Sequence, residues 1–318
     1  MKYIIITLIL FFIEIFYFKI AGKYKILDEP NHRSSHNHIT VRGGGIIFPI
    51  AIILAFLMGN VSWTVTWAVF IVATISFIDD IKPISQRPRF GSHIIAVLLI
   101  AHDLNLFQSP FWVLPLVVVL YIGWINAFNF MDGINGITVL YGLSAIVSFG
   151  FLPINKSSMP LLIIMGLSCL VFGFFNVRTK ARTFAGDVGS ISIALFLGYF
   201  MLKTIIVTGQ FGYILFFSIY GVDAIITILY RLKRKENIFQ AHRSHLYQYL
   251  VNEWGYSHIL VSIIYAVLQL LINFLVIYLD SKGNLTLPVL FILLTVLALV
   301  YLGIRAVVVK KAASIKRV

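Results

Sequence analysis

Residues 62–80 read SWTVTWAVFIVATISFIDD, a mostly apolar run that ends in two adjacent carboxylates, Asp79 and Asp80. The apolar part is long enough for a membrane-spanning helix of about 25 Å at 1.5 Å per residue. Acidic groups at a membrane boundary are costly to keep there, so they commonly mark a functional site. The stretch therefore predicts a membrane helix with chemistry at one end.

The whole chain has the composition of a membrane protein. Of its 318 residues, 60% are hydrophobic and 12% are charged, and the mean hydropathy is +0.95. A soluble protein of this size needs far more polar surface to cover its core. The one cysteine, Cys169, excludes a disulfide framework. The apolar run 3–18 lacks a small-residue cleavage site, so we expect it to remain as a first helix.

We expect an all-α, polytopic integral membrane helix bundle of about 11 transmembrane helices, folded as one domain over residues 1–318. The candidate spans are roughly 3–21, 44–59, 62–78, 92–107, 110–126, 137–152, 158–175, 190–208, 211–229, 258–279 and 287–305. Connections on one side are tight, whereas those on the other are longer and polar, at about 22–43, 79–91, 127–136, 176–189 and 230–257. Functional groups are commonly carried by such loops on a rigid scaffold, so we expect the site there.

Topology explains most of the net charge of +13. Most of the 25 lysines and arginines fall in the longer loops and the C-terminal tail. The positive-inside rule makes that side cytoplasmic, with the N-terminus outside and the C-terminus inside. The remaining basic charge suits anionic lipid or an anionic substrate, and no nucleic-acid partner is expected.

The paired aspartates allow two interpretations. Adjacent residues of a helix point about 100° apart, so Asp79 and Asp80 cannot grip one ion symmetrically. One carboxylate can face a metal or a nucleophile while its neighbour braces it. Alternatively, the two form a solvated helix end that pairs with Lys82 or Arg87.

Residues 126–136, NAFNFMDGING, set three amides, one carboxylate and two glycines directly after a predicted span. Side-chain amides and carboxylates hydrogen-bond sugars and base edges, and glycines permit a tight turn around such a ligand. A turn that only joins two helices needs far fewer of these groups. We therefore interpret the segment as part of a binding site.

Three further loop motifs suit phosphate chemistry. Asp187 stands between glycines at a predicted helix start, where it can hold Mg²⁺ against a diphosphate or, more simply, cap the helix. The glycines at 43–45, after Arg42, either expose N–H donors to a phosphate or form a flexible junction. In residues 242–248, HRSHLYQ, arginine and histidines suit a diphosphate, with a basic interfacial helix as the alternative.

Two acids, Glu14 and Asp223, lie inside predicted spans. Each is either a proton-relay group or a group satisfied within the bundle. They are the basis of an alternative function, a proton- or cation-coupled membrane transporter. A transporter should place charge near the midplane in broken helices, whereas most acids here gather at one face.

In their order along the chain, these motifs resemble those of the polyprenyl-phosphate N-acetylhexosamine-1-phosphate transferases, the polytopic phosphoglycosyl transferases of glycosyltransferase family 4. The resemblance covers about residues 28–248 and includes Asn-Ala-x-Asn-Phe-x-Asp-Gly-x-x-Gly and Phe-x-Gly-Asp-x-Gly-Ser. It implies transfer of a sugar 1-phosphate from a UDP-N-acetylhexosamine to polyprenyl (undecaprenyl) phosphate, with release of UMP. Such a reaction initiates cell-envelope glycans at the cytoplasmic face of the bacterial inner membrane.

The resemblance also implies residue roles. Asp79, supported by Asp80, would be the base or orienting group for the lipid phosphate, and Asp187 would hold Mg²⁺, for which Mn²⁺ can substitute. Substrate-binding residues would be Asn126, Asn129, Asp132, Asn135, His242, Arg243, His245 and Arg42. The basic residues Lys23, Lys25 and Arg33 would be less central helpers. The partners would be the UDP-sugar, the lipid and the membrane, with a homodimer left open.

Departures from the family pattern bear on the substrate. Asn135 stands where many relatives carry an aspartate associated with the uracil end, and Arg42 follows Thr40-Val41 rather than Thr-Pro. The run of three histidines typical of the phospho-N-acetylmuramoyl-pentapeptide branch is absent. These differences favour a transferase that initiates O-antigen-like (lipopolysaccharide) or related surface glycans. The donor sugar, the prenyl length and the oligomeric state are not assigned by the sequence.

Overall fold

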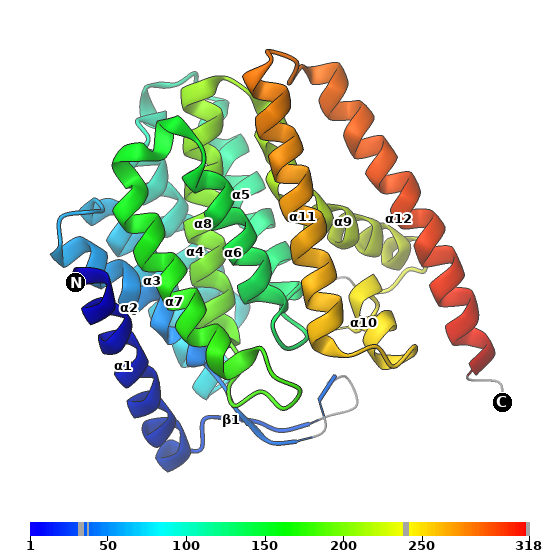
Figure 1. Ribbon diagram of the computed structural model, residues 1–318, viewed down its shortest axis with the longest axis horizontal. Coiled ribbons are helices and arrows are strands. Elements are labelled where there is room, and N and C mark those ends of the chain that lie inside the picture. The colour runs from blue at the N-terminus through cyan, green and yellow to red at the C-terminus, as the bar shows by residue number, and fades with distance from the viewer. Residues whose placement is uncertain (31–34, 37, 238–241, 316–318) are drawn as a thin grey trace.

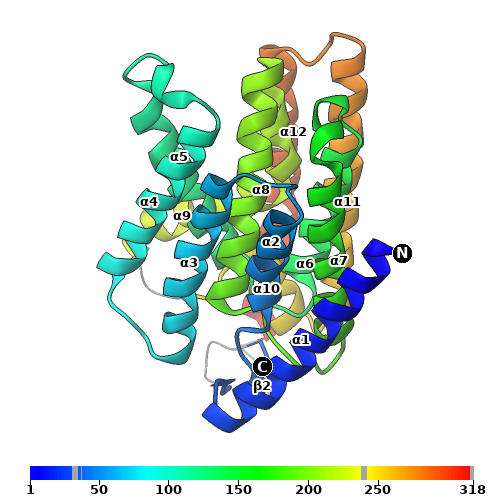
Figure 2. The ribbon, with the colours of Figure 1, turned by 90° about the vertical axis from the view of Figure 1, so that its left-hand side faces the viewer.

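Helix α8 (Gly186–Thr208) runs through the middle of a bundle of long helices (Figures 1 and 2). The computed structural model describes residues 1–30, 35–36, 38–237 and 242–315, so Arg33 lies outside the described residues. All residues from 188 to 198 are buried. They are covered by α2 (Ile47–Leu57), α3 (Trp63–Ile81), α5 (Val113–Phe130) and α6 (Ile137–Gly150). A helix that is apolar all round is stable only in such surroundings.

The other helices complete the bundle around this centre. They are α1 (Lys2–Tyr24), α4 (Gln86–Asp103), α7 (Met159–Asn176), α9 (Ser218–Lys233), α10 (Leu246–Asn252), α11 (His258–Ser281) and α12 (Leu287–Ile315). Short 3₁₀ segments lie at Gly44–Ile46, Leu106–Gln108, Pro153–Ser158 and Phe211–Phe217. Helix α11 packs on α6, and α12 packs on α9, which runs obliquely to its neighbours (Figure 1).

The polytopic helical architecture is confirmed, and the number of spans is confirmed in part. Each of the predicted spans contains a helix. In the described part of the chain, 8 helical segments are long and apolar enough to cross a membrane. Helices α2 and α6 are apolar but have only 11 and 14 residues. Helix α4 begins among the polar residues at Gln86, which lowers its hydropathy.

Several predicted loops are partly helical. Asp79 and Asp80 belong to the last turn of α3, and Asn126 and Asn129 belong to the end of α5. Helix α10 lies within the loop that was expected over residues 230–257. Polar residues at these helix ends lower local hydropathy, but they also cap or extend the helices, so a hydropathy-based boundary falls too early.

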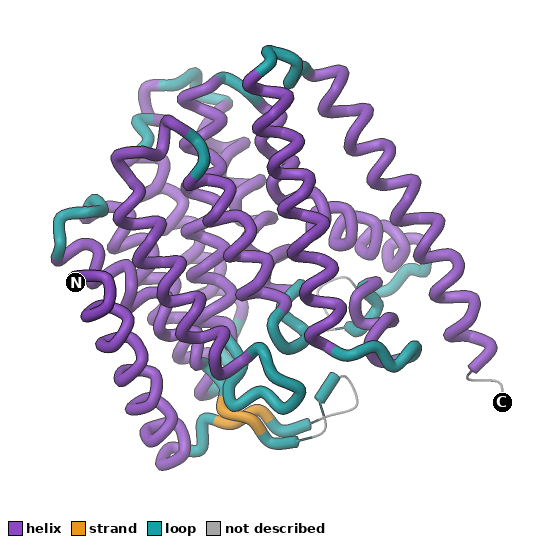
Figure 3. Tube along the Cα trace, in the orientation of Figure 1, coloured by secondary structure: helices purple, strands orange, loops and turns teal. Residues whose placement is uncertain are grey.

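A small sheet departs from the all-α prediction. Strands β1 (Leu27–Asp28) and β2 (Thr40–Val41) pair antiparallel at the end of the bundle where longer loops gather (Figure 3). Val41 also forms a parallel bridge to Thr183 in the α7–α8 loop. The sheet thereby ties the first loop to the entry of α8.

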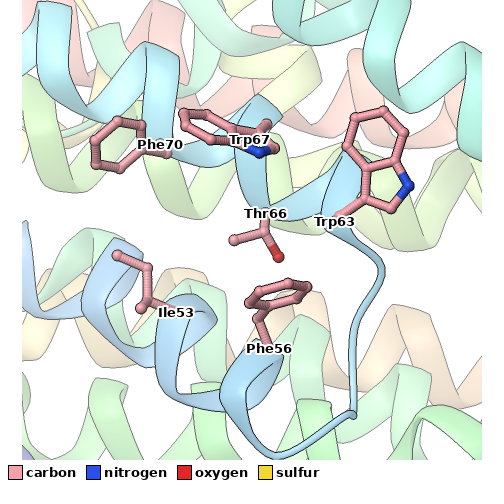
Figure 4. Close-up of a pocket in the computed structure, with 6 residues that line it drawn as sticks. All are labelled: Ile53, Phe56, Trp63, Thr66, Trp67 and Phe70. Carbon is pink, nitrogen blue, oxygen red and sulfur yellow. The ribbon is translucent and has the colours of Figure 1, made fainter.

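A small apolar pocket lies between α2 and α3 (Figure 4). Its volume is about 160 Å³ and its lining is Ile53, Phe56, Trp63, Thr66, Trp67 and Phe70. The one hydroxyl among these side chains, on Thr66, donates to the Ser62 carbonyl of its own helix at 2.8 Å. The pocket therefore offers apolar contact only.

Candidate active site

The first turn of α8 is capped by a side chain from another helix. Asp80 accepts hydrogen bonds from the backbone N–H groups of Asp187 and Val188, both at 2.9 Å. A helix start leaves such donors without intrahelical partners, and a carboxylate there also meets the positive end of the helix dipole. Arg42 Nε donates to the same carboxylate at 2.7 Å. The Asp80 side chain is fully buried, so it joins α3, α8 and Arg42.

Gly186 makes this capping contact sterically feasible. Its φ is +68°, in the left-handed region that favours glycine. A Cβ at this position would lie 2.5 Å from Asp80 Oδ2. The glycine before Asp187 is therefore required by the neighbouring carboxylate as well as by the turn.

The three glycines at 43–45 dock the entry of α8. The N–H groups of Gly44 and Gly45 donate to the carbonyls of Phe184 and Ala185, at 2.9 and 3.1 Å. These two donors are thus used within the protein. A Cβ on Gly189 would lie 2.6 Å from the Cα of Gly45, so the two backbones touch. This geometry supports neither the phosphate interpretation nor a flexible junction, and it shows a close-packed contact.

Two guanidinium groups bridge four carboxylates, of which Asp28 is paired with Arg42 at 3.7 Å. Arg89 Nη1 lies 3.0 Å from Asp79 Oδ2, and its Nη2 lies 2.9 Å from Asp187 Oδ2. Arg42 reaches Asp187 Oδ1 from the other side, with Nη2 at 3.8 Å, and is bonded to Asp80. The predicted partners Lys82 and Arg87 are replaced by these two arginines. Asp187 is the carboxylate that both arginines share.

Arg89 was not among the predicted site residues. It belongs to the first turn of α4, and the loop before it holds other basic residues that look equivalent in the sequence. The distinguishing feature is geometric, because the sharp turn between α3 and α4 brings this first turn back over the end of α3. Asp79 supports the turn by accepting the Ile84 N–H at 2.7 Å.

A polar cavity of about 770 Å³ adjoins this cluster. It brings together five of the predicted residues, Arg42, Asn129, Asp132, Asn135 and Asp187. Asp79 and Asp80 are not part of its lining. Both contact Asp187 or its neighbours from outside the cavity. Asp79 is linked to Asp187 by Arg89. Asp80 is linked to it by Arg42 and by the backbone N–H groups at the start of α8.

Other residues of the cavity lining were not predicted as site residues; they include Asp28, His36, Asn176, Gln248 and His258. His258 opens α11, 123 residues after Asn135, and its Nδ1 accepts the Asn135 N–H at 3.2 Å. Nothing in the sequence near His258 marks this contact. Gln248, in contrast, belongs to the motif at residues 242–248 that formed part of the family resemblance.

The amides of residues 126–136 have different environments. Asn126 donates to the Ile122 carbonyl of its own helix at 2.8 Å and does not line the cavity. Asn129 lines it and accepts a hydrogen bond from the Ser190 hydroxyl. Asn135 donates to the backbone carbonyls of Arg178 and Thr179, at 2.8 and 3.3 Å. The Asn135 side chain therefore holds the α7–α8 loop.

Asp132 faces the cavity close to other acids. It accepts the Thr138 hydroxyl at 2.5 Å. Removal from water, and then the negative charges of Asp187 and Asp80, raise the pKa of Asp132 to about 7, even though the Thr138 bond and Arg42 favour ionisation. Asp132 is therefore about half protonated near neutral pH.

Histidines 242 and 245 do not line the cavity. His245 is almost fully buried, with its Nδ1 3.1 Å from Asp223 Oδ1. His242 contacts the Ser244 hydroxyl at 3.0 Å. Burial, together with the nearby His245 and Arg231, lowers the pKa of His242 to about 4. His242 is therefore neutral at pH 7 and supplies no positive charge to a diphosphate.

Arg243 lies 3.6 Å from Glu253 and is also absent from the cavity lining. Residues 242, 243 and 245 therefore do not reach the cavity in this structure. Their contact with a diphosphate stays a prediction. From the same segment, Gln248 does reach the cavity.

The oxygen donors fit Mg²⁺ only together with oxygens from a substrate. Among the described residues, no group of three or more His, Cys, Asp or Glu side chains is arranged to hold an ion. Mg²⁺ commonly keeps several waters and is bound by one or two carboxylates plus substrate phosphates. Asp187 suits such a partial site because it lines the cavity beside Asp132, which supplies a second carboxyl group.

The fold and the site define a class of protein: a polytopic helical membrane protein with an acidic, arginine-bridged polar site at one end of its bundle. Residues 62–205 match the family model described as Glycosyl transferase family 4. That stretch contains the acid pair, residues 126–136 and Asp187. Over these residues the chain is similar to this family.

Individual relatives extend the similarity beyond the family model. The chain is 28% identical over 269 residues to the "Probable undecaprenyl-phosphate N-acetylglucosaminyl 1-phosphate transferase" of Bacillus subtilis, covering 76% of this chain and 73% of the relative. It is 28% identical over 239 residues to the "Phospho-N-acetylmuramoyl-pentapeptide-transferase" of Thermotoga maritima, with 68% and 76% covered. The "Undecaprenyl-phosphate alpha-N-acetylglucosaminyl 1-phosphate transferase" of the same organism is 25% identical over 250 residues, with 76% and 79% covered. These identities do not separate the N-acetylglucosaminyl 1-phosphate transferases from the phospho-N-acetylmuramoyl-pentapeptide-transferases.

Proposed function

We propose that this protein transfers an N-acetylhexosamine 1-phosphate from a UDP-sugar to polyprenyl (undecaprenyl) phosphate and releases UMP. The observation that carries the proposal is the position of Asp187. It stands on the first turn of α8, lines the polar cavity, and is flanked by Arg42 and Arg89. Carboxylate and guanidinium groups in one place suit a reaction between two anionic phosphates.

The reaction joins the two phosphates. An oxygen of the lipid phosphate attacks the phosphorus bonded to the sugar, and the bond from that phosphorus to the UMP oxygen breaks. UMP leaves with the electron pair, and the lipid product carries the sugar on a diphosphate. Mg²⁺, when bound, would offset the charge of the diphosphate and of the leaving UMP.

The protein groups hold the substrates for this step. Arg42 and Arg89 present N–H donors beside Asp187, and guanidinium groups bind phosphate oxygens in a bidentate way. Asn129 and Asp132 line the cavity and offer hydrogen-bonding groups to the nucleotide-sugar. A phosphate monoester titrates near pH 6, so a base has little proton to remove at neutral pH. Asp79 is therefore proposed to orient the lipid phosphate, through Arg89, more than to deprotonate it.

The position of the site suits a substrate with a lipid tail. Asp79 and Asp187 belong to the ends of two candidate membrane spans. A polyprenyl tail can lie in the bilayer while its phosphate reaches these ends. We propose that this end faces the cytoplasm, where UDP-sugars are made, as the charge distribution predicts. The relatives' names favour UDP-N-acetylglucosamine as the first donor to test.

The contacts of Asp223 do not support the transporter alternative. Both of its oxygens accept hydrogen bonds, from Tyr265 and from His245 among others. An acid so fully bonded is poorly suited to bind and release an ion. Glu14 has no hydrogen-bond partner in the described structure, but it belongs to α1, which is an unbroken helix, whereas transporter ion sites use broken helices.

Purified protein in detergent should be incubated with undecaprenyl phosphate, Mg²⁺ and a panel of UDP-N-acetylhexosamines, with UMP and the lipid product measured. We expect UMP release that needs the lipid and the metal and that is lost in Asp187→Asn. The conservative control is Asn126→Ala, which removes an amide outside the cavity. Release that continues without metal, or no turnover with any donor, would refute the proposal.

A further inference from the structure

A buried carboxylate in α9 holds the histidine loop in place. Asp223 Oδ1 lies 3.1 Å from His245 Nδ1 and accepts the backbone N–H of Leu246 at 3.2 Å. Asp223 has no exposed surface, and His245 is 2% exposed. Residues from the middle of a candidate span and from the start of α10 therefore meet away from water, where a hydrogen bond to a charged group is strong.

The groups around Asp223 are arranged as donors to an ionised carboxylate. The Leu246 N–H can only donate. Tyr301 accepts a hydrogen bond from Arg305 Nη1 at 2.9 Å, so its own hydroxyl hydrogen is free to point at Asp223 Oδ1, also at 2.9 Å. Tyr265 donates to the other oxygen at 2.7 Å. With its oxygens used as acceptors, Asp223 requires a hydrogen on the nitrogen of His245 that faces it.

This requirement fixes the tautomer of His245. The hydrogen must be on Nδ1, whatever the charge of the ring, and Nε2 is the nitrogen left over. Nε2 is buried and has no hydrogen-bond partner in the described structure. A buried nitrogen without a partner costs free energy, so the surroundings of Nε2 do not favour a hydrogen on it.

The same loop is connected to the cavity through α10. The backbone N–H of His245 donates to Gln248 Oε1 at 3.2 Å, and Gln248 lines the cavity. The Tyr247 hydroxyl donates to the Phe130 carbonyl at 3.2 Å, at the end of α5. From the opposite side, Arg305 Nη2 donates to the Ser244 carbonyl at 2.9 Å. The loop is therefore held between α12 and the cavity wall.

We propose that Asp223 is a positioning residue that keeps the hydrogen of His245 on Nδ1 and holds the first turn of α10, with Gln248, against the cavity. The histidine loop alone did not indicate this partner, because Asp223 lies 22 residues earlier and inside an apolar span. The part of the inference that concerns turnover rests on the proposed function. The part that concerns the tautomer does not.

The direct test is NMR of protein labelled with ¹⁵N-histidine, in detergent. The chain has 8 histidines, and the His245 signals are assigned from their absence in His245→Gln. In the wild-type protein we expect one fixed tautomer with the hydrogen on Nδ1. In Asp223→Leu the signals should shift towards averaging of the two tautomers. A wild-type His245 with its hydrogen on Nε2, or signals that Asp223→Leu leaves unchanged, would overturn the proposal.

Turnover supplies the second test. We expect Asp223→Leu to lower kcat about 10- to 100-fold, the loss usual when a group that orients a functional histidine is removed, with KM for the UDP-sugar within about 3-fold. The double variant with His245→Gln should be no slower than His245→Gln alone, because groups that act as a unit are not additive. Asp223→Asn, which keeps an acceptor oxygen, should recover part of the rate. Additive losses in the double variant would contradict a role through His245.

Gln269→Leu is the matched control for lost stability. Gln269 is also fully buried in the bundle and bonded, to Tyr141 and to the Leu215 carbonyl, but it does not touch the histidine loop. It should lower the melting temperature without changing the His245 signals or kcat. If wild-type protein transfers no sugar phosphate, the proposed function fails. The tautomer measurement then still decides the relation between Asp223 and His245.

Discussion

Asp80 accepts the backbone N–H of Asp187 at 2.9 Å, across 107 residues of sequence. The two acids therefore have different structural roles. Asp80 is fully buried and holds the start of α8, whereas Asp187 keeps part of its surface and lines the cavity. A carboxylate that caps a helix fixes the position of the residue on its first turn. The acid pair on α3 thus places the acid on α8.

Asp80→Asn should destabilise the protein. The amide replaces either Oδ1, which accepts the Asp187 N–H and Arg42, or Oδ2, which accepts the Val188 N–H. An unsatisfied buried group costs about 1–3 kcal/mol. The melting temperature in detergent should fall, and activity should fall because Asp187 loses its fixed position. Asp187→Asn should lose activity with little change in melting temperature. Equal melting temperatures for Asp80→Asn and wild type would contradict the capping role.

Gly189→Ala should also destabilise the protein, through sterics. The added Cβ would lie 2.6 Å from Gly45 Cα, and neither backbone can move without shifting a helix. Overpacking of this kind costs about 1–3 kcal/mol. Gly123→Ala is the control, because nothing lies within 4 Å of its Cβ position on α5. Thermal unfolding should separate the two, and a Gly189→Ala protein as stable as the control would argue against the close contact.

Arg89→Gln should bind divalent metal more tightly and turn over more slowly. Its guanidinium pairs with Asp79 and Asp187, so its removal leaves more negative charge for a cation. We expect the affinity for Mn²⁺, measured by electron paramagnetic resonance, to rise about 3- to 10-fold, or about 1 kcal/mol, the order expected for one nearby charge that water screens. Arg87→Gln is the charge-matched control, since Arg87 is exposed. Equal affinities in the two variants would contradict the arginine bridge.

The pH dependence of stability should reveal Asp132. Its pKa is raised to about 7 in the folded protein, above the value of about 3.9 expected in an unfolded chain. The folded state therefore binds the proton more tightly, and this contribution is complete below about pH 4 and is lost as pH rises through 7. Without metal or substrate, the melting temperature should fall between pH 5 and 8. Asp132→Asn should weaken that fall. An unchanged melting profile in this variant would show that a group other than Asp132 causes the pH dependence.

Asn135→Asp should be poorly tolerated. The Asn135 amide donates to the carbonyls of Arg178 and Thr179, and a carboxylate would turn oxygens towards both. The lost donors and the repulsion should cost about 1–3 kcal/mol. Asn126→Asp is the comparison, since Asn126 bonds only its own helix at 2.8 Å and lies outside the cavity. If both variants melt alike, the amide does not hold the α7–α8 loop.

Much of the architecture follows from local sequence. Apolar runs such as 62–78 predict membrane helices because hydropathy sums along a short stretch and needs no partner. Asp187 was expected at a helix start, and α8 begins at Gly186. Residues 126–136 were expected to form part of a site, and Asn129, Asp132 and Asn135 do line the cavity. Predicted boundaries were less accurate at α4, which begins at Gln86 rather than 92, and at α12, which ends at Ile315 rather than 305, because polar residues there weaken the hydropathy signal.

The identity of each contact partner was decided by the tertiary structure. Arg89 rather than Arg87 reaches Asp79 because of how α4 turns back on α3, and His258 meets Asn135 across 123 residues. His245 was expected at the substrate but is bonded to Asp223 in α9. These pairings depend on how closely helices pack, as where Gly45 touches Gly189, and neither hydropathy nor a motif encodes that distance. The sequence determined which residues lie at the ends of the helices; the packing of the helices determined which of them meet, because hydrogen bonds act over a few ångströms between elements far apart in the chain.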